Sequence, residues 1–168
     1  NVMMTINSTC LYSITDFMDW MLSMKSRFTD EFVPVWSVNL LRFPSFMNPA
    51  ALPDDLRMER KEHLESWLST RKYHPYMHQM EIDGIQRLID YLDVIKTPHR
   101  KTSSRMSRYR DFKTFHMQYD SRRAKDFNAT FPKILTDWYD SIPETDLGRY
   151  QELVNGDAQN QFEEFREQ

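Results

Sequence analysis

Two short apolar segments near the start of the chain constrain the fold more than any other feature. The segment Val2 to Ile6 is nearly continuous in apolar residues, as is typical of a strand buried on both faces. A second run, Val33 to Leu41, also predicts a strand, although Pro34 interrupts it early. The stretch between them is long enough for a crossover helix, which makes the two strands parallel and the unit right-handed. The sequence therefore predicts the α/β class.

The crossover helix is expected to be capped by Ser13 or Thr15 and to bury one apolar face. Its apolar residues recur at the spacing that places side chains on one side of a helix, namely at Phe17, Trp20, Met21, Met24 and Phe28. A two-stranded parallel sheet with two apolar faces is unstable in water by itself. We therefore expect neighbouring strands, either encoded upstream of Asn1 or supplied by another protomer.

Helical patterns dominate the sequence after a proline-punctuated aromatic loop at residues 43–49. Four amphipathic faces are predicted, and residues 97–104, which are polar and basic, predict a linker or mobile loop between the second and the third. The faces comprise Leu56, Leu64, Trp67 and Leu68; Ile82, Ile85, Ile89 and Leu92; Met106, Tyr109, Phe112, His116 and Tyr119; and Phe131, Ile134, Leu135, Trp138 and Ile142. We expect residues 1–52 to form the strands and crossover helix, residues 53–155 a mainly α-helical extension, and residues 156–168 a frayed tail.

The composition excludes several kinds of site. Three glycines in the whole chain cannot build a glycine-rich phosphate loop. The only cysteine, Cys10, can form neither an internal disulfide nor a cysteine-rich metal site, and it fits a reducing, cytoplasmic compartment. No apolar run is long enough to span a bilayer, and residues 1–10 lack the pattern of a signal peptide. His74 and His78 are four residues apart, but Pro75 lies between them, so we expect no metal site there.

Charge is distributed unevenly along the second half of the chain. Residues 96–125 contain ten Lys or Arg against two Asp, whereas residues 126–168 contain three Lys or Arg against ten Asp or Glu. The favoured interpretation is that these neighbouring helices pair with each other, and the alternative is a basic face for nucleic acid or another anion. Arg122 and Arg123, near a helix end, are assigned to structural pairing with the acidic helices or to an anionic ligand.

Polar residues follow both predicted strands at their carboxyl ends, where α/β folds built on parallel strands bind their ligands. Thr5, Asn7 and Ser8 end the first strand, and Asn39 and Arg42 end the second. We predict that these five residues line a cofactor or substrate cavity, with Arg42 able to receive a carboxylate or phosphate. The alternative is that Asn7 and Asn39 cap turns and that Arg42 pairs with an acidic residue.

Three segments in this order carry a resemblance to a known family. They are Thr5-Ile6-Asn7-Ser8 before a helix, then Val38-Asn39-Leu40-Leu41-Arg42-Phe43-Pro44-Ser45-Phe46, then the stretch from Asp120-Ser121-Arg122-Arg123 to Thr130-Phe131-Pro132. Together they resemble the carboxyl-terminal portion of radical S-adenosylmethionine proteins of the twitch-domain kind, over most of residues 2–142. The resemblance implies that Val2 to Ile6 and Val33 to Leu41 are the last two strands of a partial (β/α) barrel.

The resemblance also implies a chemistry that this chain cannot perform alone. In such enzymes a [4Fe-4S] cluster held by a CxxxCxxC motif cleaves S-adenosylmethionine to a radical that abstracts a substrate hydrogen. That motif is absent here, and Cys10 alone cannot hold a radical or an auxiliary cluster. Ala124 stands where the family pattern has a glycine after the paired arginines.

Three functional readings follow. In the favoured hypothesis the chain is a fragment or split half of a radical S-adenosylmethionine enzyme and has no catalytic residues of its own. It would need the amino-terminal barrel half or another protomer as its partner. Together they would line a cavity for a peptide or small molecule. The second is a noncatalytic binding module in which the basic helix 105–123 meets nucleic acid or an acidic partner. The third is a truncated, functionally silent product.

Overall fold

The computed structural model describes residues 1–27, 34–94 and 102–143. Within these residues the sheet consists of two strands, β1 (Val2–Ile6) and β2 (Trp36–Leu40). The strands are parallel, which confirms the predicted strand order and direction. The predicted start of the second strand lies outside the described residues. Because the described sheet has two strands only, the fold is mixed α/β without a closed or partial barrel of its own.

Helices make up most of the described chain. The α-helices are α1 (Ile14–Lys25), α2 (Asp54–Arg71), α3 (Gln79–Val94), α4 (Thr102–Arg123), α5 (Phe127–Thr130) and α6 (Lys133–Ser141). Short 3-10 turns lie at η1 (Cys10–Tyr12), η2 (Ser45–Met47) and η3 (Pro49–Ala51). The start of α4 at Thr102 corrects the prediction of a polar linker over 97–104, of which residues 97–101 lie outside the described part.

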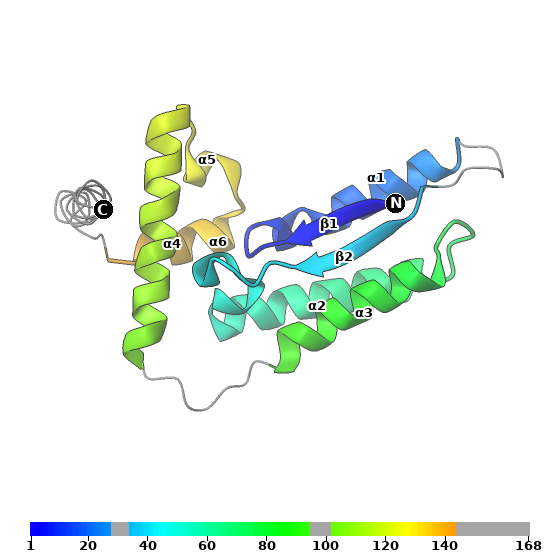
Figure 1. The fold of residues 1–168 in the computed structure, drawn as a ribbon, viewed down its shortest axis with the longest axis horizontal. Coiled ribbons are helices and arrows are strands. Elements are labelled where there is room, and N and C mark those ends of the chain that lie inside the picture. The colour runs from blue at the N-terminus through cyan, green and yellow to red at the C-terminus, as the bar shows by residue number, and fades with distance from the viewer. Residues whose placement is uncertain (28–33, 95–101, 144–168) are drawn as a thin grey trace, which may run out of the picture.

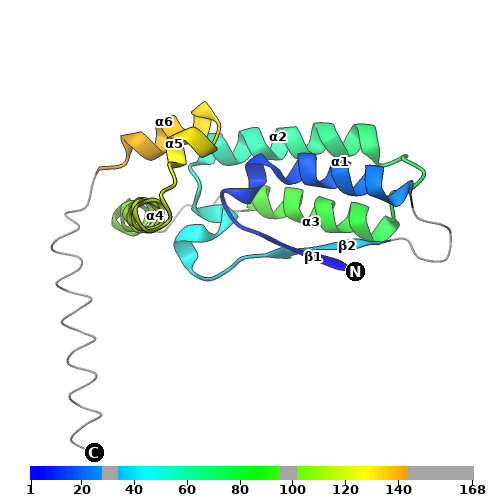
Figure 2. The same cartoon turned by 90° about the horizontal axis from the view of Figure 1, so that it is seen from above.

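The sheet buries only one of its faces. Met4 and Ile6 of β1 are buried, whereas Thr5 between them is exposed. In β2, Val38 is buried and Asn39 is exposed. Figure 2 shows the reason, because α1, α2 and α3 all lie on the same side of the two strands. The prediction of strands buried on both faces is therefore wrong for the described residues, and the second face of the sheet is open.

Helix α1 is rotated relative to the face predicted from the sequence. Phe17 and Trp20 were expected inside, but their side chains are 36% and 53% exposed. Met21 is buried as predicted, but the buried face also runs through Met18 and Leu22 and ends at Lys25, which is fully buried. A lysine interrupts any apolar pattern, so periodicity alone predicts a face that is rotated from the observed one and shares Met21 with it. Phe28, also expected on this face, lies outside the described residues.

Lys25 is buried because it forms part of a polar network between three elements. Its Nζ lies 2.6 Å from both carboxylate oxygens of Glu81 in α3 and 2.9 Å from the carbonyl oxygen of Tyr76. The same carboxylate accepts the backbone N–H of Trp36 in β2 at 3.0 Å and that of His78 at 2.8 Å. The network thereby fixes α1 and α3 against the first residue of β2, and each buried charge has a partner.

The carboxyl ends of both strands point towards the part of the molecule formed by α4, α5 and α6 (Figure 1). The two parts meet where Phe46 of η2 contacts Phe115 of α4, with ring centroids 5.6 Å apart. Behind this contact, Phe112 and Phe127 pack edge to face at 5.9 Å, and both are buried. Of the apolar positions predicted for these helices, Met106, Tyr119 and Ile134 are exposed, whereas Phe112, His116, Leu135 and Ile142 are buried.

Candidate functional site at the flanks of the sheet

The residues after β1 are used by the turn that follows the strand. Asn7 Oδ1 accepts hydrogen bonds from Thr9 N, Thr9 Oγ1 and Cys10 N at 3.0, 2.8 and 2.8 Å, which is an Asx-type start to η1. Ser8 is fully buried, and its backbone N–H donates to the carbonyl oxygen of Met47 at 2.8 Å. Asn7 therefore caps a turn, which was the alternative to its lining a cavity. It does not line the pocket that contains Asn39 and Arg42.

Asn39 and Arg42 do lie together, at the outer flank of β2. They line a pocket of about 410 Å³ with two side chains of α3, Arg87 and Leu88, and with Gly84. Val38 and Leu40 complete its wall. The structure therefore adds Arg87 to the predicted pair, and nothing in the sequence marks this residue, because it comes from a helix 45 residues after Arg42 along the chain.

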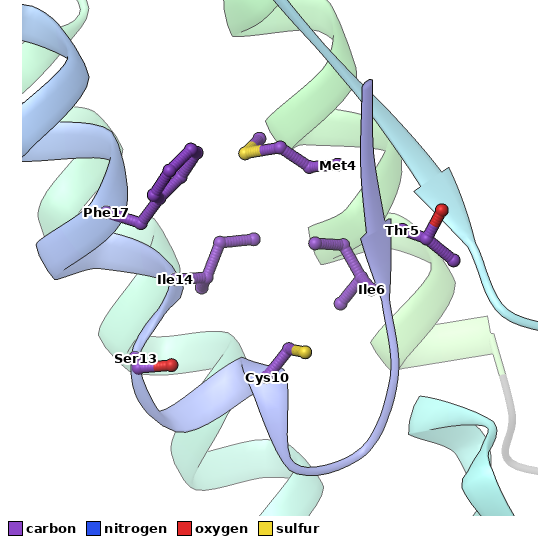
Figure 3. A pocket seen from close by; sticks show the side chains of 7 residues that line it. All are labelled: Met4, Thr5, Ile6, Cys10, Ser13, Ile14 and Phe17. Atoms are coloured by element: carbon purple, nitrogen blue, oxygen red, sulfur yellow. The ribbon is translucent and has the colours of Figure 1, made fainter. Parts of the chain in front are cut away.

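A second pocket lies at the other flank of the sheet, between β1 and α1. Its volume is about 230 Å³, and its lining is mostly apolar. Figure 3 shows Met4, Ile6, Ile14 and Phe17 converging on the space between the strand and the helix. Thr5 points to the other side of the strand in the same view. This pocket lies directly beside the outer edge of β1.

The backbone register determines which peptide groups are free at the two edges. Val2 N–H donates to the carbonyl oxygen of Val35 at 2.7 Å, and Leu41 N–H donates to that of Ile6 at 2.9 Å. In a parallel pair, alternate residues of each strand point their peptide groups at the neighbour. Met3 and Thr5 therefore direct theirs away from β2. On β2, the residues Trp36, Val38 and Leu40 direct theirs away from β1.

Three cations of α4, Lys113, Arg122 and Arg123, form no ion pair with the acidic residues that follow them in the described chain. Lys113 is buried and donates to the carbonyl oxygen of Ile142 at 2.6 Å. Arg123 lies over the ring of Tyr119, 5.7 Å from its centroid. The following acidic residues have other partners: Asp126 accepts from Asn128 N, Asp137 pairs with Lys133, and Asp140 accepts from the Asn128 amide. Arg122 and Arg123 have no ion pair with a carboxylate among residues 126–143, and the acidic residues from 144 onward lie outside the described part.

The end of α4 has a backbone conformation that favours glycine. Ala124 follows Arg123 with a φ of 49°, the only positive φ of a non-glycine residue in the described chain. The next N–H, of Lys125, donates to the carbonyl oxygen of Asp120 at 3.1 Å, which closes the helix as in a Schellman turn. A residue with a Cβ is strained here, and this is the position where the resemblance has a glycine.

The remaining candidates from the sequence form no metal site within the described residues. His74 Nδ1 accepts the backbone N–H of Tyr76 at 3.3 Å, and His78 uses its own N–H for the Glu81 carboxylate. Cys10 is half-buried and has a free thiol. No described helix is both long and apolar enough to cross a membrane.

Comparison with known proteins found no family model, no curated protein and no solved structure that matches this chain.

Proposed function

We propose that this chain is the carboxyl-terminal part of a radical S-adenosylmethionine protein and that it forms one wall of that protein's cofactor and substrate cavity. The observation that carries the proposal is the outer edge of β1, which pairs with no other strand among the described residues and lies beside an apolar pocket. A strand edge with unpaired peptide groups is a template for another strand. In the proposed barrel, β1 and β2 are the last two strands, so the preceding strand belongs at the edge of β1.

The flank of β1 has the features that an added strand needs. The outward peptide groups of Met3 and Thr5 offer two donors and two acceptors for a parallel ladder. Next to them, Ile14 and Phe17 of α1 form an apolar wall that every second side chain of an added strand would contact. Trp20, one turn along α1, is 53% exposed and extends this apolar surface.

The open face of the sheet fits the interior of a barrel. In such folds the helices lie outside, and residues on the other face of the strands point inwards. Thr5 and Asn39 are exposed on this open face, and they are paired across the two strands. Their polar side chains would contact S-adenosylmethionine or a small-molecule or peptide substrate. Ala124 adds support, because its positive φ is the conformation that the family's glycine would adopt.

The chemistry of the proposed parent is not assigned to residues of this chain. A [4Fe-4S] cluster requires several thiolate ligands, and Cys10 is the only cysteine. The residues present therefore do not fit the cluster, and its ligands belong to the upstream part of the protein. The role proposed for this chain is to complete the sheet and to line the cavity.

The test has two steps: the coding sequence upstream of this chain is read, and the binding of the upstream product to this chain is measured. The coding region that precedes this chain is expected to contain CxxxCxxC within about two hundred codons. The product of that region should bind the 168-residue chain, and S-adenosylmethionine retention in equilibrium dialysis should require both parts. Absence of the motif, or S-adenosylmethionine binding that is unaffected by this chain, would refute the proposal.

Two substitutions at the β1 edge distinguish strand addition from another mode of association. Thr5→Pro removes an outward N–H without removing a β1–β2 hydrogen bond, so it should abolish assembly. Thr5→Ala changes the same side chain, retains the N–H and should assemble. Equal assembly of both variants would exclude pairing at this edge.

A second candidate function has one observation in its favour. Phe115 and Tyr119 are exposed on α4 with their rings stacked at 6.4 Å, and the exposed Arg122 and Arg123 lie one turn beyond Tyr119. Aromatic and basic side chains on one exposed helix can bind single-stranded nucleic acid. If the chain binds an oligonucleotide and its affinity falls by about tenfold or more between 50 and 200 mM salt, the result would favour this binding module. No binding at low salt would exclude it.

A further inference from the structure

We propose that the pocket at the outer flank of β2 binds the phosphate group of a small molecule, with Arg42 and Arg87 as its two cationic ligands. This site lies at the outer edge of β2, on the other side of the sheet from the edge of β1, and it shares Asn39 with the open face of the sheet. It therefore does not depend on added strands. A partial barrel ends at β2, so the pocket stays accessible whether or not the proposed assembly forms.

The backbone of β2 supplies hydrogen-bond donors to this pocket. Trp36, Val38 and Leu40 direct their N–H groups to the same side of the strand, towards α3. The first of these donors is satisfied by an anion, because Glu81 Oε1 accepts from Trp36 N at 3.0 Å. The N–H groups of Val38 and Leu40 have no acceptor among the described residues. The same edge thus binds one carboxylate of the protein and leaves two further donors at the pocket.

The two arginines make this pocket strongly positive. Neither Arg42 nor Arg87 forms an ion pair with a carboxylate in the part of the chain that the structure describes. The guanidinium of Arg87 lies over Gly84, because a Cβ at position 84 would be 3.8 Å from Arg87 Nη2. The same Cβ would be 3.5 Å from Val38 Cγ2, so α3 packs closely against β2 at this point. The side chains that line the pocket include two cations and no carboxylate.

The nearest acidic residues of α3 do not neutralise the pocket. Asp83 accepts from the Gln79 amide at 2.8 Å, and Asp90 accepts from the Gln86 amide at 2.9 Å. Neither of them lines the pocket. Two guanidinium groups and no carboxylate therefore define the local field, although the chain as a whole has a net charge of -3.

The geometry and charge select a phosphate group on a small molecule. A volume of about 410 Å³ is within the usual range of small-molecule pockets. A phosphate monoester has a charge close to -2 at neutral pH and three acceptor oxygens, which match two guanidinium groups and two N–H donors. A monocarboxylate has half this charge and two oxygens, so it would leave part of the site without a partner.

The experiment is a titration of the 168-residue chain with inorganic phosphate and pyrophosphate, followed by amide NMR spectra. The amide signals of Val38, Leu40 and Gly84 should shift together and saturate. Arg87→Gln and Arg42→Gln should each weaken binding at least tenfold, about the loss of one charge-assisted contact. Arg87→Lys should weaken it less, because it retains the charge and loses the fork of donors. Arg27→Gln, at an exposed arginine after α1, is the matched control and should bind as the wild type does.

Several outcomes would overturn the proposal. One is no saturable shift at these amides with either phosphate probe. Another is equal binding of acetate or succinate, which would exclude a phosphate-selective site. A third is unchanged affinity in both Arg42→Gln and Arg87→Gln when their amide spectra show a folded chain. Because no upstream product is present, these results are independent of the assembly experiment.

Discussion

Lys25 Nζ lies 2.6 Å from both carboxylate oxygens of Glu81, and neither side chain is exposed to solvent. The pair connects α1 to α3, and through the backbone N–H of Trp36 it also holds β2. Replacing one member leaves the other as an uncompensated buried charge. This relationship therefore yields the largest stability effect that we predict.

Glu81→Gln is expected to reduce the free energy of unfolding by about 3–5 kcal/mol, since the Lys25 ammonium would lose its counter-charge. The double variant Lys25→Met with Glu81→Gln should cost less than the sum of the single variants, because no unpaired charge remains and the amide still accepts from Trp36. Urea unfolding of the four proteins of this cycle measures the coupling. Additive losses of stability in the two single variants would contradict the ion-pair account.

Asp137→Asn is the control, because Asp137 forms an exposed ion pair with Lys133. This variant should show little change in the free energy of unfolding.

Ala124→Gly is expected to stabilise the chain by about 0.5–1 kcal/mol, because glycine adopts a positive φ without the strain of a Cβ. The same substitution at Ala129, an exposed residue inside α5, should be neutral or destabilising. Thermal unfolding of both variants provides the comparison. Equal destabilisation by the two glycines would show that Ala124 is not strained.

Stability should depend on pH through His116. Its ring is buried among Phe112, Phe127 and Tyr139, with Nε2 lacking a partner among the described residues. Burial lowers the pKa of His116 to about 4, from an ordinary value of 6.5. The unfolded chain therefore binds the proton more tightly, and stability is fully present above pH 6.5 and falls as the pH decreases towards 4.

The loss over this window should approach about 3 kcal/mol, from about 1.4 kcal/mol for each unit of pKa difference. Chemical denaturation at pH 7.5, 5.5 and 4.5 measures it. His116→Phe should flatten this part of the pH dependence, whereas His74→Gln, at a more exposed histidine, should leave it unchanged. A His116→Phe variant with the full pH dependence would contradict the assignment.

The flank of β1 should cause the isolated chain to associate with itself at high concentration, because a free strand edge lies beside exposed apolar side chains. Trp20→Lys should weaken this association without a large loss of stability, as Trp20 is 53% exposed. Tyr73→Lys alters a side chain that is 83% exposed in the turn after α2 and serves as the control. Sedimentation velocity over a range of concentrations gives the result. The prediction would be contradicted if the chain stays monomeric at all concentrations, or if Trp20→Lys and Tyr73→Lys change self-association equally.

The sequence by itself determined the local elements and their order. Apolar runs indicated both strands, and helical periodicity indicated the buried positions Leu64, Ile85, Phe112 and Leu135. The length of the crossover also required a parallel pair, which the structure has. These features follow from backbone geometry and from spacing along one segment, so that no distant residue is needed to predict them.

Tertiary structure alone decided which faces are covered and which polar groups meet. Phe17 and Trp20 are exposed because α1 turns Lys25 inwards to reach Glu81, a partner 56 residues away. Arg87 joins Arg42 because α3 lies along the outer side of β2. Within the described residues one sheet face is open, because α1, α2 and α3 all lie on the other. Such contacts depend on how separate elements pack, and the spacing of residues within one element contains no information about that packing.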